Sequence, residues 1–366
     1  MIWAVVILLL VLTLFGAGVA VWMEASGKLM REHPEVTPIR IVSEAEGLAE
    51  TEAFLREEFH RKPKALLAEG ATRLDLLHAK REMFDREGTA RDHRATYQSG
   101  DANGVPGEWT LTEGCDPTRR LLYLHGGGFT VGSPQSHRAI TSALSRGADC
   151  AVFAPEYRLM PEHARLDSLA DALTAYRWLL DNGPGGEAPL SALFIGGDSA
   201  GANLTLAVLQ QARDAGLRAA DAAVVFSPSA DYTASGPNIR RNFATDTMLQ
   251  PLIKPLLDAP RAILPFALWK AMGARPTDPR ISPLFGDLND LPPTLIQVSA
   301  TEMLYDDAVR YAAKAQAEGS EVKLEIWAAP DGSPPLPHVW QMFTHWLPGA
   351  RKALDRASAF LGGQVQ

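Results

Sequence analysis

Short apolar runs alternate with helical patterns over the chain from Gly104 to its C-terminus. The apolar runs predict strands at residues 109–111, 121–124, 150–154, 192–195, 222–226, 294–298 and 322–327. Helical patterns lie between or after them, at about residues 167–180, from Ala200 onward, at 306–317 and at 339–361. Nearly continuous apolar strands that alternate with helices are typical of a mainly parallel sheet with helices on both faces. The pattern therefore predicts an α/β fold.

Residues 41–101 have a different pattern, which is highly charged and helical. Ser43 with Glu46 three residues later is a capping-box signature, and apolar residues from Leu48 to Phe59 follow with roughly helical spacing. Leucines between positions 66 and 77 indicate a second helix. We interpret this segment as a pair of amphipathic helices.

The chain starts with a long apolar run. Residues 2–22 contain no charged side chain, and a helix of this length spans the roughly 30 Å hydrocarbon core of a bilayer. Trp3 and Trp22 lie near its ends, where aromatic rings favour the lipid–water interface. A cleaved signal peptide, the alternative, normally has a basic start and an apolar run of about 7–15 residues. The observed run is longer and has no basic start, so residues 1–23 are predicted to be a transmembrane anchor.

The residues around the end of this run bear on its processing and orientation. A small-residue site at Gly18-Val19-Ala20 leaves cleavage open. Lys28, Arg31 and Arg40 follow the run, and no basic residue precedes it. The positive-inside rule therefore predicts that the rest of the chain lies in the cytoplasm.

Charge and cysteine usage narrow the range of partners. The 366 residues include 35 Lys and Arg against 43 Asp and Glu, a formal net charge of −8, which argues against sequence-independent binding to nucleic-acid phosphates. Cys115 and Cys150 cannot make a disulfide framework and are too far apart for a zinc-knuckle spacing. No H-E-x-x-H motif occurs either. The sequence predicts no nucleic-acid partner and no metal site.

One candidate site is the segment Gly197-Asp198-Ser199-Ala200-Gly201, which lies between a predicted strand and a predicted helix. This is the context that the G-x-S-x-G nucleophile elbow requires. The sharp turn strains the serine backbone and needs small neighbours, and it places the Ser199 hydroxyl at a helix N-terminus, where developing negative charge is favoured. A glycine-rich structural turn is the alternative interpretation of this segment alone.

A second glycine-rich loop, His125-Gly126-Gly127-Gly128-Phe129, directly follows another predicted strand. Successive glycines let backbone N–H groups approach a ligand closely, and acyl transfer needs such donors for its oxyanion. A phosphate loop is disfavoured because no Walker lysine follows, and the spacing is not that of a dinucleotide fingerprint. Two such loops behind two strands, about 70 residues apart, predict a serine hydrolase.

A serine nucleophile also needs a general base and an acid, in the chain order Ser, Asp or Glu, His. Only two histidines follow the elbow, His338 and His345. His338 lies in a proline-rich loop and is the candidate base, whereas His345 is expected inside the next helix as an ordinary packed or surface residue. Glu302, in the loop after a predicted strand, is the candidate acid, with Asp306 as the reserve.

These loops resemble those of the hormone-sensitive-lipase-like family of α/β-hydrolases, also called bacterial esterase family IV. Further segments resemble the family at residues 104–109, 157–163, 282–284, 291–294, 302–307 and 338–340. The resemblance extends from about Gly104 to the C-terminus. Glu302 stands where Asp is commoner in the family, although Glu serves in other members. The N-terminal apolar run is not part of the family pattern.

The resemblance implies an α/β-hydrolase fold with a mainly parallel central sheet flanked by helices and a helical cap. It implies a serine carboxylesterase for short-to-medium acyl esters that needs no cofactor. In such an enzyme Ser199 attacks the acyl carbonyl, His338 moves the proton, and Glu302 orients His338. The expected oxyanion donors are the N–H groups of Gly127, Gly128 and Ala200.

The expected organisation follows from the same resemblance. It comprises a transmembrane anchor (1–23), an N-terminal helical cap region (24–103), the first part of the hydrolase core (104–239), a cap insertion (240–280) and the second part of the core (281–366). Apolar residues of the insertion are candidates to line an acyl tunnel, with packing inside the cap as the alternative. They are Met248, Leu249, Leu252, Ile253, Leu256 and Leu257.

Two other functions stay open at this point. Anchored relatives resembling arylacetamide deacetylase combine an N-terminal span with these motifs, so amide or acetyl-ester hydrolysis is one alternative. A non-catalytic ligand-binding protein, like the plant gibberellin receptors, is the other, although such receptors lack the catalytic histidine. The expected partners are a small-molecule ester and the membrane, and a homodimer is left open.

Overall fold

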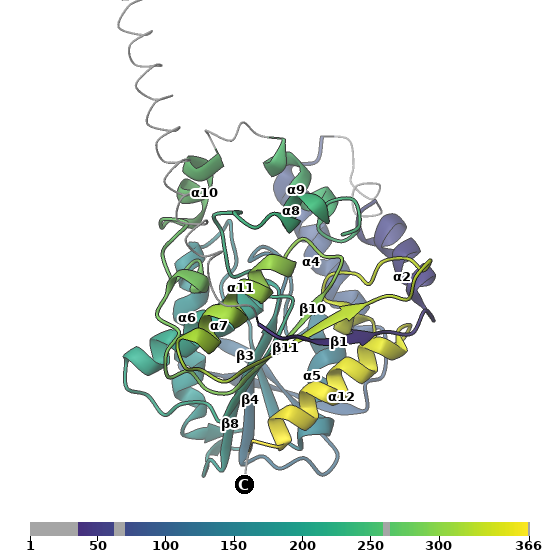
Figure 1. Ribbon diagram of the computed structural model, residues 1–366. Helices are drawn as coiled ribbons and strands as arrows, with labels where there is room; N and C mark the ends of the chain where they lie inside the picture. The colour runs from purple at the N-terminus through teal and green to yellow at the C-terminus, as the bar shows by residue number, and fades with distance from the viewer. Residues whose placement is uncertain (1–35, 62–69, 259–263, 365–366) are drawn as a thin grey trace, which may run out of the picture.

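A nine-stranded sheet forms the centre of the molecule in the computed structural model, which describes residues 36–61, 70–258 and 264–364 (Figure 1). From edge to edge its strands are β1 (Ile39–Val42), β11 (Val322–Ala328), β10 (Thr294–Ser299), β9 (Ala222–Phe226), β8 (Ala192–Asp198), β4 (Arg119–Leu124), β5 (Ala151–Pro155), β3 (Pro106–Thr112) and β2 (Ala95–Asp101). All neighbouring strands from β1 to β5 in this order pair in parallel. Only β3 is reversed, since it pairs antiparallel with both β5 and β2. The predicted α/β-hydrolase fold is confirmed.

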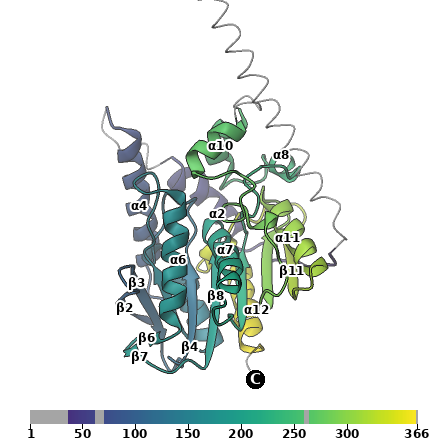
Figure 2. The ribbon, with the colours of Figure 1, turned by 90° about the vertical axis from the view of Figure 1, so that its left-hand side faces the viewer.

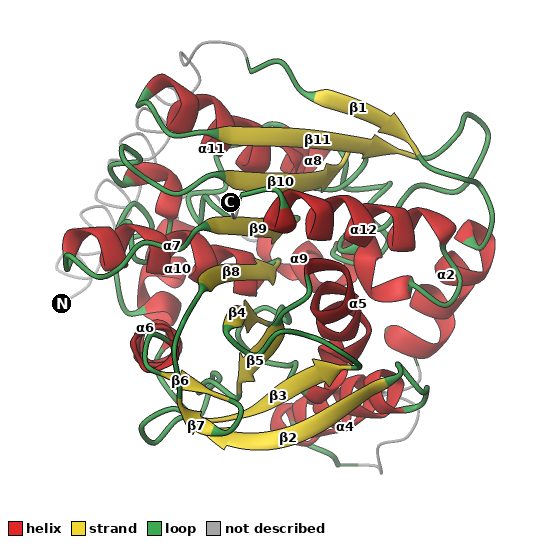
Figure 3. Ribbon diagram, turned by 90° about the horizontal axis from the view of Figure 1, so that it is seen from below, coloured by secondary structure: helices red, strands yellow, loops and turns green. Residues whose placement is uncertain are grey.

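Helices cover both faces of the sheet. Figures 2 and 3 show α6 (Arg165–Leu179), α7 (Ala200–Asp214) and α11 (Tyr305–Ala317) on one face, and Figure 3 shows α5 (Arg138–Ala148) and α12 (Pro348–Gly362) on the other. Successive strand residues point to opposite faces. In β8, Leu193 and Ile195 therefore join the core under α7, whereas Phe194 joins the core under α5 and α12. This two-sided burial explains why the strands read as continuous apolar runs.

A third apolar cluster holds the N-terminal helices against the C-terminal part of the chain. Leu48 of α2 (Leu48–Phe54), Phe59 of the π-helical turn η1 (Leu55–Phe59) and Phe84 of α4 (Arg73–Thr89) pack with Trp340 and Phe343. Figure 1 shows the short helices α8 (Asn238–Arg241), α9 (Gln250–Leu257) and α10 (Leu264–Met272) at one end of the sheet. The small hairpin of β6 (Asn182–Gly183) and β7 (Gly186–Glu187) lies apart from the main sheet.

The prediction that residues 41–101 are helical is wrong at both ends of the segment. β1 pairs with β11, and β2 pairs with β3, so both strands belong to the sheet. The predicted capping box at Ser43 and Glu46 is also wrong, because the residue before α2 is Gly47 and no side chain caps that helix. The capping box of this region is instead at Thr72 and Asp75, where α4 begins.

The prediction of one helix over residues 339–361 is wrong in its first part. A short 3-10 helix, η4 (Trp340–Phe343), precedes a turn, and α12 begins at Pro348. Proline is favoured at the first helical position because it has no N–H to leave unpaired there. His345 consequently lies in the turn before α12, with its ring 3.9 Å from that of Trp346, and not inside a helix.

The structure also bears on the predicted membrane anchor. Within the part of the chain that the structure describes, no helix is both long enough and apolar enough to cross a membrane. The apolar run at residues 2–22 lies outside the described residues. The finding corrects the predicted localisation, since a single-pass anchored protein with a cytoplasmic catalytic domain is not supported.

Candidate active site

Loops that follow five adjacent strands meet at one edge of the sheet. Because β4, β8, β9, β10 and β11 are parallel neighbours, their carboxyl ends lie together. These ends lead respectively into the loops that hold Gly127, Ser199, Ser227, Glu302 and His338. Parallel pairing thus brings together residues that are far apart in the sequence.

Ser199 lies in a strained turn between β8 and α7. Its backbone has φ 52° and ψ −114°, a conformation that non-glycine residues rarely adopt. The turn leaves no space beside it: a Cβ on Gly197 would lie 2.5 Å from the carbonyl oxygen of Leu124, and one on Gly201 would lie 1.9 Å from the same oxygen. The predicted need for small neighbours is confirmed.

Gly201→Ala is therefore expected to destabilise the protein by at least about 1–3 kcal/mol, the usual effect of overpacking. Urea unfolding followed by circular dichroism measures this change. Gly362→Ala near the end of α12 is the matched control, because a Cβ there meets nothing within 4 Å. Equal stability of Gly201→Ala and wild type would contradict the assigned geometry.

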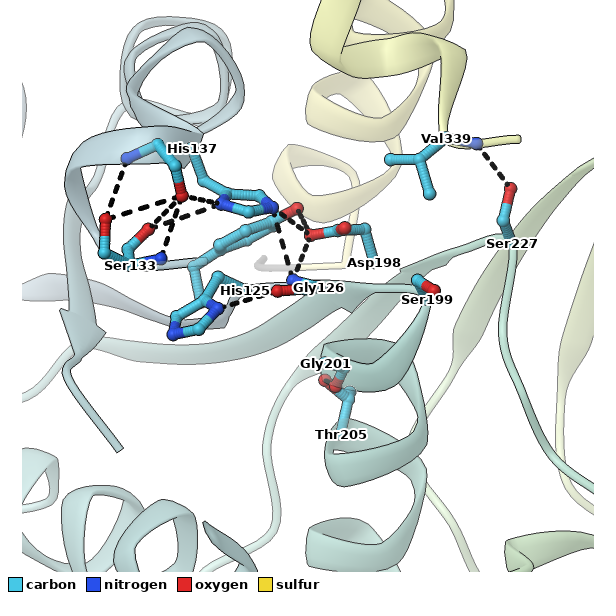
Figure 4. A network of polar contacts seen from close by, with 12 residues as sticks. His125, Gly126, Ser133, His137, Asp198, Ser199, Gly201, Thr205, Ser227 and Val339 are labelled. Carbon is cyan, nitrogen blue, oxygen red and sulfur yellow. Dashed lines mark hydrogen bonds and ion pairs between the residues drawn. The ribbon is translucent and has the colours of Figure 1, made fainter. Parts of the chain in front are cut away.

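His338 reaches Ser199 from the loop between β11 and η4. Its Nε2 is 2.8 Å from Ser199 Oγ, and its side chain is only 2% exposed. The next residue, Val339, has φ 49° and donates its N–H to Ser227 Oγ at 3.2 Å, which fixes this loop on the end of β9. Figure 4 shows the Val339–Ser227 contact beside Ser199.

Glu302 lies on the other side of His338. Its Oε2 is 3.6 Å from His338 Nδ1 and accepts hydrogen bonds from Ser227 Oγ at 2.8 Å and Ser299 N at 3.4 Å. Asp306, the reserve candidate, instead accepts from the backbone and side chain of Asn238. The structure thus brings Glu302, and not Asp306, to the histidine.

Charges around His338 favour its protonated form. Burial lowers its pKa, but the neighbouring carboxylate of Glu302, with further contributions from Asp246 and Asp198, outweighs burial and raises the pKa above the usual value. Burial raises the pKa of Glu302 itself. A histidine in this setting can take a proton from Ser199 and hold it as an imidazolium beside a carboxylate.

The glycine loop after β4 lies beside Ser199 and has backbone donors that none of the described residues uses. Gly127 and Gly128 have φ of 116° and 61°, and a Cβ on Gly127 would lie 2.1 Å from the carbonyl oxygen of Val131. Within the described part of the chain, no hydrogen bond uses the N–H groups of Gly127, Gly128 or Ala200. These donors are available to a ligand oxygen.

A buried polar network holds this loop on the elbow, as Figure 4 shows. Asp198 Oδ1 accepts from Gly126 N at 3.0 Å and Tyr123 Oη at 2.8 Å, and it lies 3.3 Å from His137 Nε2. Burial raises the pKa of Asp198, but the neighbouring His137 outweighs this and lowers it. Burial also lowers the pKa of His125 to about 3, so this residue is neutral. The ionised Asp198 therefore fixes the glycine loop.

The cavity above Ser199 is mostly apolar and has a volume of about 370 Å³. It is lined by the site residues Gly127, Gly128, Ser199 and His338 and by a set of apolar side chains: Phe59, Leu77, Phe84, Val131, Met248, Leu249, Leu252 and Met342. Met248, Leu249 and Leu252 are three of the six residues that the sequence offered as an acyl-tunnel lining. Ile253 and Leu257 do not line this cavity, and the side chain of Leu256 is outside the described residues.

Two residues of the site are not apparent from the sequence. Ser227 follows β9 and bonds both Glu302 and Val339, and only its position after a strand could have indicated it. Asp246 is 1% exposed, accepts from Leu249 N and Met303 N, and places a further buried carboxylate near His338. Among the described residues, no group of three or more His, Cys, Asp or Glu side chains could hold a metal ion.

Comparison with known proteins identifies the family. The α/β-hydrolase-fold family matches residues 121–330. An acetyl-hydrolase of Streptomyces hygroscopicus is 41% identical over 243 residues, which cover 66% of this chain and 75% of that protein, and an esterase of Acinetobacter venetianus is 31% identical over 257 residues, covering 70% and 78%. The crystal structure of an esterase from the bacterial hormone-sensitive lipase family is similar with a TM-score of 0.72 at 32% identity, covering 87% of this chain and 98% of that one. The chain therefore belongs to the hormone-sensitive-lipase-like esterases of the α/β-hydrolase family and is a carboxylic-ester hydrolase.

Proposed function

We propose that this protein is a serine carboxylesterase that hydrolyses short-to-medium acyl esters through Ser199, His338 and Glu302. The observation that carries the proposal is the 2.8 Å contact between Ser199 Oγ and His338 Nε2 at the base of an apolar cavity. Nucleophile and base within hydrogen-bond distance, with an acid beside the base, are the arrangement that acyl transfer needs. The presence of His338 argues against a non-catalytic ligand-binding protein.

In the first half of the reaction, Ser199 Oγ attacks the ester carbonyl while His338 Nε2 accepts the hydroxyl proton. The carbonyl oxygen becomes an oxyanion and accepts hydrogen bonds from the N–H groups of Gly127, Gly128 and Ala200. The tetrahedral intermediate then collapses, the bond to the alkoxide breaks, and His338 returns the proton so that the alcohol leaves. Glu302 stabilises the imidazolium during these steps.

In the second half, a water molecule attacks the acyl-enzyme and gives its proton to His338. The same N–H groups hold the second oxyanion, and collapse releases the carboxylic acid and restores the Ser199 hydroxyl. Because His338 must be neutral to accept a proton, its raised pKa places the acid limb of the activity profile above pH 6.5.

The acyl group is proposed to occupy the cavity between α4 and α9. Its walls are mostly apolar and come from both segments, so an alkyl chain is desolvated there on both sides. We propose that η1 and α4, together with α8, α9 and α10, form the cap that the sequence places at residues 24–103 and 240–280. The homodimer that the sequence left open is not tested by these observations and stays a prediction.

Met342→Ala is expected to shift the chain-length preference towards longer acyl groups. Met342, Phe59, Phe84 and Met248 separate the main cavity from a second apolar pocket, which is lined further by residues such as Trp346. Removing the Met342 side chain would join the two spaces. The ratio of kcat/KM for p-nitrophenyl octanoate to that for butyrate should rise by about tenfold. This lies within the roughly 10- to 200-fold change in discrimination that one methylene group produces in an apolar pocket.

Leu74→Ala is the control for this change, since Leu74 is on α4 but is exposed and lines neither pocket. Its chain-length profile should equal that of wild type. An unchanged ratio in Met342→Ala would show that these side chains do not limit the acyl site.

Hydrolysis of acetyl esters or amides is a second candidate, because one relative at 41% identity is an acetyl-hydrolase. The same catalytic groups serve an amide when His338 protonates the leaving amine. Rates on p-nitrophenyl acetate, butyrate and hexanoate and on an acetanilide separate the two functions. The proposed esterase prefers butyrate or hexanoate, and a preference for the anilide would favour the alternative.

A fluorophosphonate probe tests the proposed nucleophile directly. The probe should form a covalent adduct with the Ser199 peptide, located by mass spectrometry, and should stop the hydrolysis of p-nitrophenyl butyrate in proportion to labelling. Labelling at another serine with full loss of activity would overturn the assignment.

A further inference from the structure

Arg165 is a buried cation beside the glycine loop. It is the first residue of α6, and its side chain is 1% exposed. The guanidinium lies over the ring of Phe129 with Cζ 3.7 Å from the ring centroid, and Nη2 donates to Asn203 Oδ1 at 2.5 Å. Nε and Nη1 have no hydrogen-bond partner among the residues that the structure describes.

Its surroundings make this charge costly. Burial lowers the pKa of Arg165 to about 10, which still leaves it protonated at neutral pH. The position at the start of α6 sets the cation against the positive end of the helix dipole. No carboxylate of the described residues forms an ion pair with it, although buried charges are normally paired. An apolar side chain of similar size would avoid these costs.

The contacts of Arg165 join the two loops that would hold the oxyanion. Phe129 directly follows Gly128, so the stacked guanidinium rests on the glycine loop. Asn203, on α7, donates its backbone N–H to Ser199 O at 3.1 Å and its side-chain amide to Ser229 O at 2.6 Å. Arg165 therefore contacts a residue next to the glycine-loop donors and a residue that is hydrogen-bonded to the elbow.

On the basis of the proposed esterase mechanism, we propose that Arg165 is a positioning residue for the oxyanion hole. Its guanidinium holds Phe129 against Asn203. It thereby fixes the N–H groups of the glycine loop relative to the N–H group of Ala200. Its positive charge lies behind these donors in a medium of low dielectric constant, where it favours negative charge on the substrate oxygen. The charge is useful only when the oxyanion forms.

Arg165→Met tests the proposal, because it keeps most of the side-chain length without the charge. We expect kcat for p-nitrophenyl butyrate to fall by about 10- to 100-fold, less than the loss of a direct oxyanion donor, with KM within about threefold of wild type. The inhibition constant of phenylethane boronic acid, which forms a tetrahedral anion on the serine, should rise by the same factor. Arg165→Lys, which keeps the charge, should recover most of both losses.

Arg120→Met is the matched control. Arg120 is equally buried at the start of β4, away from the loop after that strand, and it donates to the carbonyl groups of Leu179, Ala188 and Pro189. This variant should lose thermal stability and keep the kcat and boronate affinity of its folded fraction. If Arg165→Met does not fold, Arg165→Gln, which keeps a donor for Asn203, is measured in the same way.

The outcomes separate this proposal from the proposed function. A folded Arg165→Met or Arg165→Gln with wild-type kcat and boronate affinity would overturn the role of Arg165, as would Arg165→Lys losing as much as the uncharged variants. The esterase function is judged instead on turnover by the wild-type protein and its loss in Ser199→Ala.

Discussion

Ser199→Ala is expected to lower kcat for p-nitrophenyl butyrate by about 10⁵- to 10⁶-fold, the loss typical of a serine nucleophile. Without the hydroxyl, His338 Nε2 has no proton to accept from this position, and no acyl-enzyme forms. Alanine and serine are similarly strained in the backbone conformation of the elbow, so the substitution should leave the fold intact. Steady-state rates at substrate saturation, with circular dichroism as a check on folding, measure the effect.

The matched control for this loss is Ser145→Ala. Ser145 is a fully buried serine on α5 that bonds Cys150 O and Thr112 N, away from the strand ends that carry the site. Its removal should change stability but not kcat or fluorophosphonate labelling. Residual activity above about 1% of wild type in Ser199→Ala would identify another nucleophile.

The elbow and the glycine loop could be predicted because their chemistry is local. Gly197 and Gly201 are required by contacts with the neighbouring strand β4, and Gly127 and Gly128 are required by their positive φ angles. Such requirements are visible as residue types at fixed spacing. The chain order of nucleophile, acid and base then led to Glu302 and His338, which the structure places beside each other.

The edge strands could not be predicted, because β2 lacks the apolar pattern of buried strands and β1, Ile-Arg-Ile-Val, is only four residues long. β2 reads Ala-Thr-Tyr-Gln-Ser-Gly-Asp and is mostly exposed or half-buried, and β1 is also largely exposed. Their strand conformation comes from pairing with β3 and β11, which is a tertiary effect. The helix-like spacing of apolar residues in this charged segment does not indicate pairing with distant strands such as β3 and β11.

Side chains that act through a neighbour were missed for the same reason. Ser227 meets Glu302 only because β9 and β10 are adjacent, and Arg165 meets Asn203 only because α6 packs on α7. Neither residue belongs to a motif with fixed spacing. Contacts between distant segments set their roles, and those contacts required the structure.

Glu302→Gln is the second change expected to have a large effect, with kcat/KM lower by about 10³- to 10⁴-fold. Glutamine can offer its NH₂ group to His338 Nδ1, which would favour the tautomer with the proton on Nε2, and that tautomer cannot accept the Ser199 proton. The change also removes the negative charge that stabilises the imidazolium. Initial rates on p-nitrophenyl butyrate from pH 5 to 9 measure both consequences.

The direction of the pH effect distinguishes this role from simple packing. In wild type, the Glu302 carboxylate raises the pKa of His338, so activity is lost as the pH falls through a value above 6.5. Without that charge, the pKa of His338 falls relative to wild type, so the acid limb of Glu302→Gln should move to lower pH. Glu302→Asp, which keeps the charge on a shorter side chain, should retain the wild-type limb and lose at most about tenfold in rate. A Gln variant whose acid limb stays in place would show that the charge of Glu302 does not act on His338.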